Sequence, residues 1–122
     1  MIENFAAKNP NAHCFISLGQ LRYLSCIKQV DGVVGNSSSG LLEAPTFKKG
    51  TINIGDRQLG RLQSKSIINC EPSFKSIVSA IEYLYSNAFQ SNLKTTVNPY
   101  GNGGASQKVV KILKKYPLDN IV

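Results

Sequence analysis

Short apolar runs alternate with segments of helical periodicity, and this alternation limits the folds open to the chain. Three of the runs lie at residues 32–35 (GVVG), 51–54 (TINI) and 66–69 (SIIN). Buried parallel strands have this composition, because both of their faces are covered. Strands that alternate with helices through short polar connections form a parallel sheet covered by helices. The sequence therefore predicts the α/β class.

Helical periodicity fills the segments between these runs. Apolar residues three or four positions apart predict a helix at 20–29 and a longer one that starts at Ser73 and reaches Ala88. A brief helix at 40–47 should be shortened or kinked by Pro45, because proline disrupts a helix interior.

Two further elements complete the prediction. Residues 13–18 (HCFISL) indicate another strand, and the turn-rich segment 98–106 (NPYGNGGAS) precedes a final helix that Ser106 is expected to cap. Ligands of parallel sheets bind where the strands end at their carboxyl side. The loops 35–40 and 55–61 follow strands in this way, so a binding site is expected there.

Composition indicates a small globular domain. The chain has 122 residues, of which 42% are hydrophobic. No apolar run is long enough to span a bilayer and the first residues lack a signal-peptide pattern, so a cytoplasmic location away from membranes is expected. Cys14, Cys26 and Cys70 lie in apolar surroundings without metal-binding spacing, which predicts buried, reduced thiols and neither a metal nor a cofactor.

The net charge of +7 favours anionic partners. Apart from the pair at 48–49, the lysines are scattered or fall within 108–115, where they alternate with apolar residues as on the solvated face of a helix. No basic motif with interleaved aromatic residues is present, which disfavours nucleic acid. A membrane surface and a phosphorylated small molecule are the other anionic partners that this charge favours.

The segment 35–40 (GNSSSG) places three serines between two glycines after a predicted strand. The nucleophile elbow of hydrolases requires G-x-S-x-G, and here the second glycine comes one residue late. A P-loop requires Lys and Ser/Thr where Leu41 and Leu42 stand. Two interpretations stay open: a metal-free cradle for a diphosphate, or a plain cap for the following helix.

Glu43 and Arg57 bear on this choice. Glu43 can accept hydrogen bonds from the vicinal hydroxyls of a ribose, or it is a surface carboxylate near a helix N-terminus. Arg57 lies in the loop 55–61 (GDRQLGR), and its planar guanidinium offers paired donors to phosphate. An exposed basic loop is the alternative, but Arg57 favours the diphosphate cradle.

Three motifs in this order, GNSSSGLLEAPTF, TINIGDRQLGR and NPYGNGGAS, resemble those of UDP-N-acetylglucosamine 2-epimerases. The resemblance is greatest to the hydrolysing kind that feeds sialic-acid and capsule synthesis, and it covers about residues 16–115. It implies a Rossmann-like sheet, as in the second domain of a glycosyltransferase-B-like fold. Residues 1–122 would then be a single, partial C-terminal nucleotide-sugar-binding domain without the N-terminal catalytic domain.

The resemblance also implies roles for individual residues. Ser37, Ser38 and Arg57 match residues that bind the UDP diphosphate, and Glu43 matches a ribose-binding glutamate. The glycines that would shape the two loops are Gly35, Gly40, Gly55 and Gly60. In the third motif, Asn102 stands where the family has an acid and Gly104 where it has an asparagine.

The family reaction eliminates UDP through a 2-acetamidoglucal, and it uses carboxylates and a histidine for proton transfer. None of these groups has a counterpart here, because His13 lies outside any matching motif. By the same resemblance, the first two strands of the family's second domain are expected to be missing as well. The expectation is the UDP-binding half of an enzyme that converts UDP-N-acetylglucosamine to N-acetylmannosamine plus UDP, or to UDP-N-acetylmannosamine, with no catalytic residue of its own.

A rival hypothesis is a non-enzymatic nucleotide-binding module, either a truncated remnant or a subunit that needs a partner. The predicted strand at 13–18 would then pair differently, or another chain would complete the sheet. Besides UDP or a UDP-sugar, the expected partner is therefore a second protein chain: another copy or the missing half. A basic nucleic-acid-binding domain is the third and least favoured reading.

Overall fold

The computed structural model describes residues 1–116. Its sheet has three strands, β1 (Gly32–Gly35), β2 (Gly50–Ile54) and β3 (Ile67–Cys70), in the order β1-β2-β3. Both pairs are parallel, with Gly32 opposite Gly50 and Ile52 opposite Ile68. The predicted α/β class is confirmed, since a parallel, Rossmann-like sheet is flanked by helices.

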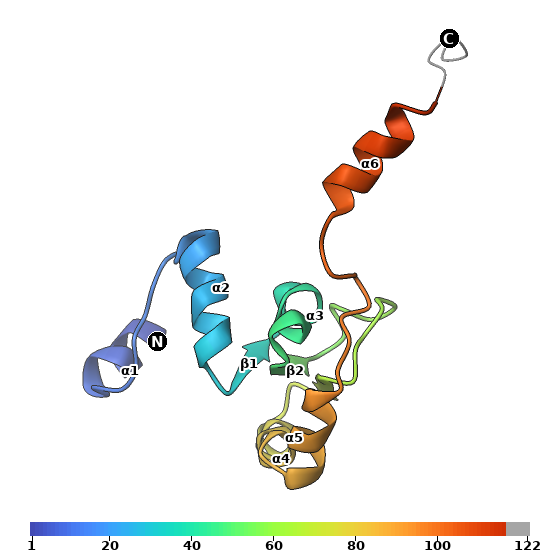
Figure 1. The fold of residues 1–122 in the computed structure, drawn as a ribbon. Coiled ribbons are helices and arrows are strands. Elements are labelled where there is room, and N and C mark those ends of the chain that lie inside the picture. The colour runs from blue at the N-terminus through green and yellow to red at the C-terminus, as the bar shows by residue number, and fades with distance from the viewer. Residues whose placement is uncertain (117–122) are drawn as a thin grey trace.

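Helices lie on both sides of this sheet (Figure 1). In chain order they are α1 (Ile2–Lys8), α2 (Gly19–Gln29), α3 (Ser39–Leu42), the 3₁₀ helix η1 (Ala44–Phe47), α4 (Phe74–Leu84), α5 (Asn87–Lys94) and α6 (Ala105–Leu113). In Figure 1, α4 and α5 lie below the sheet and α3 above it, whereas α6 stands away from the rest. As predicted, Pro45 ends the short helix early, and the chain continues as η1.

The hydrophobic core lies between the sheet and the helices α4 and α5. Successive strand residues point to opposite faces, and Ile52 and Ile68 point to the face that α4 and α5 cover. The other fully buried members of this cluster are Ala80, Leu84, Phe89 and Leu93. Because this face is dry and apolar, polar ligands must bind elsewhere.

The opposite face of the sheet carries α3. Thr51 follows the alternation to this side, where its hydroxyl donates a 3.0 Å hydrogen bond to the Gly40 carbonyl. Ile27 of α2 is buried, and α2 contacts η1. These contacts fix α3 directly above β2, and with it the loop at residues 35–40, called the serine-rich loop below.

β1 is an edge strand. Within residues 1–116 it pairs with β2 on one side, and no strand pairs with its other side. Val34 of this strand is 54% exposed. The sheet therefore has an open edge next to α2.

The prediction of a strand at residues 13–18 is wrong. This segment has no regular structure, and Ile16 is fully exposed. A strand needs a neighbour to satisfy its backbone hydrogen bonds, and this segment has none among the described residues. Gly19, with φ of 65°, then starts α2.

Two helix boundaries also differ from the prediction. The long helix from Ser73 breaks at Tyr85, and Ser86 caps the separate helix α5 by accepting a 3.2 Å hydrogen bond from the Phe89 N–H. The apolar pattern continues through the break, so periodicity alone predicted one helix. Ser106 does not cap α6, because Gly104 holds the N-cap position with φ of 74°.

The cysteines are free, but their predicted burial is wrong for two of them. Cys14 and Cys26 are exposed, and Cys70 is half-buried. Among residues 1–116, Ile27 is the buried residue of α2, and Cys26 lies on another side of this helix. Within residues 1–116, no helix combines the length and the apolar character needed to cross a membrane.

Candidate functional site

The serine-rich loop follows β1 and turns directly into α3. Ser37 is exposed and Ser38 half-buried. The Ser37 hydroxyl accepts a 3.3 Å hydrogen bond from the Ser39 N–H, and the Ser38 carbonyl accepts from the N–H groups of Leu41 and Leu42. Among the residues that the structure describes, no hydrogen bond uses the backbone N–H of Ser37 or Ser38. These two amides are therefore donors available to a ligand.

The second loop (residues 55–61) follows β2 and is held against the serine-rich loop through Asn36. Gln58 is buried, and its Nε2 donates a 2.7 Å hydrogen bond to the Asn36 carbonyl. Arg57 is exposed, and its Nη1 lies 3.4 Å from Asn36 Oδ1. The guanidinium thus lies beside the loop that carries Ser37 and Ser38, and an anion bound there would meet both amide donors and a positive charge.

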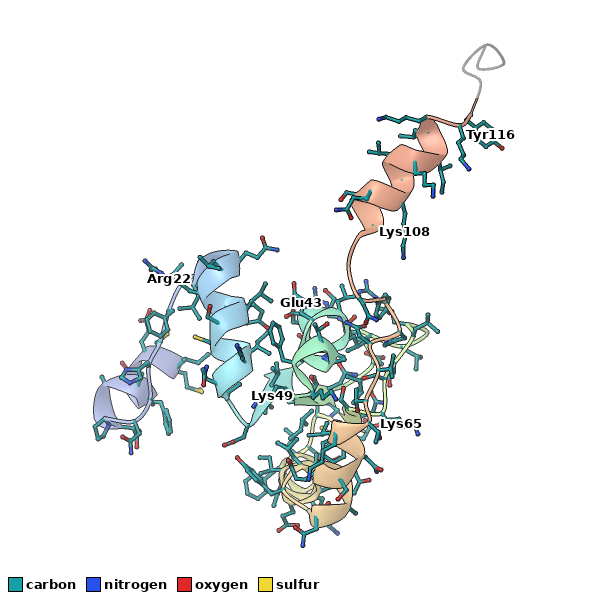
Figure 2. The ribbon with its side chains drawn as sticks, in the orientation of Figure 1. Arg22, Glu43, Lys49, Lys65, Lys108 and Tyr116 are labelled. Atoms are coloured by element: carbon teal, nitrogen blue, oxygen red, sulfur yellow. The ribbon has the colours of Figure 1, made fainter. Side chains whose placement is uncertain are left out.

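Glu43 lies at the end of α3, on the side that faces α2 (Figure 2). Its carboxylate is hydrogen-bonded to the Ser39 hydroxyl, which also lies 2.7 Å from Tyr23 Oη. Glu43 and Tyr23 line an open hollow of about 960 Å³, together with His13, Phe15 and the residues around Gly19. Because Ser39 engages one of its oxygens, the carboxylate has less free acceptor capacity than the sequence suggested.

The segment 98–106 (NPYGNGGAS) contacts the helices that follow the serine-rich loop. Asn98 is buried, and its Nδ2 donates hydrogen bonds to the Leu42 carbonyl at 2.8 Å and to Thr46 Oγ1 at 2.7 Å. Tyr100 donates to the Leu62 carbonyl at 3.0 Å. Asn102 is exposed. This segment therefore braces α3 and η1, and it contacts the chain directly after the loop 55–61.

Glycine is required in the two loops for different reasons. Gly55 and Gly60 have φ of 76° and 79°, a conformation that residues with a Cβ rarely adopt, and Gly35 has φ of 150°. Gly40 has no such φ. A Cβ built there would lie 2.4 Å from Thr51 Cγ2, so Gly40 permits close packing of α3 on β2.

Two groups outside the loops have shifted pKa values. Burial raises the pKa of the Cys70 thiol, and the nearby Glu71 carboxylate raises it further. The negative charge of Asp31 raises the pKa of the Tyr85 hydroxyl, which also donates a 3.2 Å hydrogen bond to it. Both groups therefore stay protonated at neutral pH, so Cys70 is a poor nucleophile. Within residues 1–116, no three His, Cys, Asp or Glu side chains gather as metal ligands.

The sequence predicted the two loops but not the residues that join them. Asn36 and Gln58 connect the two loops, and Ser39 and Tyr23 connect Glu43 to α2. Asn36 and Ser39 lie inside the motif GNSSSGLLEAPTF, so their place in this motif indicated a role in the site. Tyr23 is 16 residues from Ser39, and no spacing rule connects them.

The fold and the loops together define the class of the protein. It is an α/β protein whose parallel, Rossmann-like sheet carries two polar, glycine-shaped loops at the carboxyl ends of β1 and β2. The family model for UDP-N-acetylglucosamine 2-epimerase matches residues 1–114. The chain belongs to this family.

Curated relatives agree with this assignment. The chain is 44% identical to a "GDP/UDP-N,N'-diacetylbacillosamine 2-epimerase (hydrolyzing)" of Campylobacter jejuni, over 100% of the chain and 32% of the relative. It is 41% identical to "Polysialic acid biosynthesis protein P7" of Escherichia coli, over 83% of the chain and 26% of the relative. A Legionella pneumophila "UDP-N,N'-diacetylbacillosamine 2-epimerase (hydrolyzing)" is 28% identical, over 90% of the chain and 28% of the relative. The chain thus spans about a third or less of the length of these relatives.

Proposed function

We propose that the chain is the UDP-binding portion of a hydrolysing UDP-N-acetylglucosamine 2-epimerase. The observation that carries the proposal is the joining of two loops through Asn36, which puts Arg57 beside the free amides of Ser37 and Ser38. Arg57 and the two serines would hold the diphosphate. Glu43 would bind the ribose, and the adjoining hollow has space for the base. Family membership supports a nucleotide sugar as the substrate class.

UDP titration tests these assignments. We expect the wild-type chain to bind UDP weakly, and Arg57→Ala or Glu43→Ala to weaken binding roughly tenfold, because each removes a charge-assisted hydrogen bond. Isothermal titration calorimetry measures the dissociation constants. Arg61→Ala is the matched control, since Arg61 is exposed in the same loop and should leave the affinity close to that of the wild type.

Equal affinities in the wild type and all three variants would overturn the site assignment. An oligonucleotide serves as a competing ligand. Tighter, strongly salt-dependent binding of the oligonucleotide would instead favour the nucleic-acid reading, since binding to the phosphate backbone releases counterions. The spread of Lys49, Lys65 and Lys108 over separate parts of the molecule (Figure 2) favours the small anion.

The chain alone is proposed to bind without turnover. Arg57 and the serines can hold a leaving group, but the groups that move the C2 proton in this family have no counterpart among the matched motifs. We expect no release of UDP or N-acetylmannosamine from UDP-N-acetylglucosamine, as measured by chromatography. The Campylobacter relative, assayed alongside on its own named substrate, is the positive control for detecting a released nucleoside diphosphate. Product formation by the chain would contradict the proposal.

The open edge of β1 and the short span of the match favour a second candidate, a module that functions with a partner chain. In this proposal a strand of the partner pairs with β1 and covers Val34. Sedimentation equilibrium of the purified chain tests a partner that is a second copy. A monomer at all concentrations would leave a different chain as the partner, whereas a dimer would support self-association.

A further inference from the structure

A chain of hydrogen bonds connects α2 to the carboxylate of Glu43. Tyr23 Oη lies 2.7 Å from Ser39 Oγ, and Ser39 Oγ is hydrogen-bonded to Glu43 Oε2. A serine hydroxyl has one proton, and an ionised carboxylate can only accept. The Ser39 hydroxyl therefore donates its hydrogen bond to Glu43, and the Tyr23 hydroxyl donates a hydrogen bond to Ser39. The hydrogen bonds therefore run from Tyr23 to Ser39 and from Ser39 to Glu43.

This series of hydrogen bonds restricts the rotamers of Glu43. All three side chains are half-buried, and Tyr23 and Glu43 line the same hollow. Glutamate has three rotatable bonds, and ordering such a side chain on ligand binding is costly. A side chain that is already held by Ser39 avoids this cost. The second oxygen, Oε1, then remains for a ligand.

We infer that Tyr23 and Ser39 are positioning residues that make Glu43 selective for ribonucleotides over deoxyribonucleotides. The inference rests on the proposed function, in which Glu43 accepts from a ribose hydroxyl. A carboxylate held in one orientation leaves an acceptor without a partner when that hydroxyl is missing, and such a loss weakens binding strongly. A mobile carboxylate can turn toward water and discriminates less.

The test compares UDP with 2′-deoxy-UDP and 3′-deoxy-UDP on the full chain. We expect the wild type to bind at least one deoxy ligand roughly tenfold more weakly than UDP. Tyr23→Phe keeps the ring and removes the hydroxyl that donates a hydrogen bond to Ser39. The ratio of the dissociation constant of the deoxy ligand to that of UDP should therefore fall about threefold. Ser39→Ala should lower it at least as much. The ratio of dissociation constants is the readout, because a general loss of folding weakens all three ligands alike.

Two variants act as matched controls. Tyr83→Phe removes a tyrosine hydroxyl on α4, and Ser25→Ala removes a serine hydroxyl that donates to the Leu21 carbonyl within α2. Both should keep the wild-type ratio. Thermal melting monitors folding, and Tyr23→Phe decides the case if Ser39→Ala does not fold.

The outcomes separate this inference from the proposed function. A wild type that does not bind UDP overturns both. A wild type that binds UDP and discriminates against a deoxy ligand, with an unchanged ratio in Tyr23→Phe, overturns the inference alone. A wild type that binds all three ligands equally overturns the ribose role of Glu43 and the inference with it.

Discussion

Phe89→Ala is expected to lower the free energy of unfolding by about 3–5 kcal/mol, a large part of the stability of a domain of this size. Phe89 is 2% exposed and belongs to the cluster between the sheet and the helices α4 and α5. Its ring centroid lies 5.2 Å from that of Tyr83. A Cβ on Gly50 would lie 2.8 Å from Phe89 Cε1, so the ring packs directly on β2. Alanine would leave a cavity beneath the strand that carries the second loop.

Urea denaturation followed by circular dichroism measures this loss. Phe74→Ala is the matched control, because Phe74 begins α4 and is 85% exposed. Its replacement should change the unfolding free energy by no more than about 0.5 kcal/mol. Similar losses in the two variants would contradict the placement of the core between the sheet and α5.

Gly40→Ala is expected to destabilise the chain by about 1–3 kcal/mol through overpacking. The new methyl group would lie 2.4 Å from Thr51 Cγ2 and 3.2 Å from Thr51 Oγ1. Relief requires α3 to move away from β2, which would displace the serine-rich loop. We therefore expect UDP affinity to fall together with the melting temperature.

Thr51→Ser tests the cause of this loss. Serine removes the Cγ2 methyl and keeps the hydroxyl that donates to the Gly40 carbonyl. The double variant Gly40→Ala with Thr51→Ser should recover at least about 1 kcal/mol relative to the sum of the single changes, as a double-mutant cycle measures. Additive effects would show that Thr51 is not the group that the new methyl meets.

The strands of the sheet were predictable because their signals are local. Apolar, β-branched runs predicted β1, β2 and β3 within one residue at each end. The same signal was wrong for residues 13–18, since a strand also requires a neighbour and the described residues provide none. Ser86 was missed because the apolar pattern from Ile77 to Ala88 continues through the break.

The site was predictable in outline and not in its connections. Residue types and the family resemblance selected Ser37, Ser38, Glu43 and Arg57, and their roles remain proposals. The hydrogen bond from Gln58 to Asn36 joins residues 22 positions apart, and the one between Tyr23 and Ser39 joins residues 16 positions apart. Such contacts depend on how α2 and the second loop pack, which no local pattern encodes.

The open edge of β1 has a consequence for the behaviour of the chain in concentrated solution. Edge strands are commonly protected by lysine or proline, and β1 has only glycine and valine. Mutual repulsion from the net charge of +7 therefore opposes strand addition between copies. This repulsion extends only about 8 Å at physiological ionic strength. The salt content of the buffer, more than the sequence of the edge, then sets the concentration at which the chain stays dispersed.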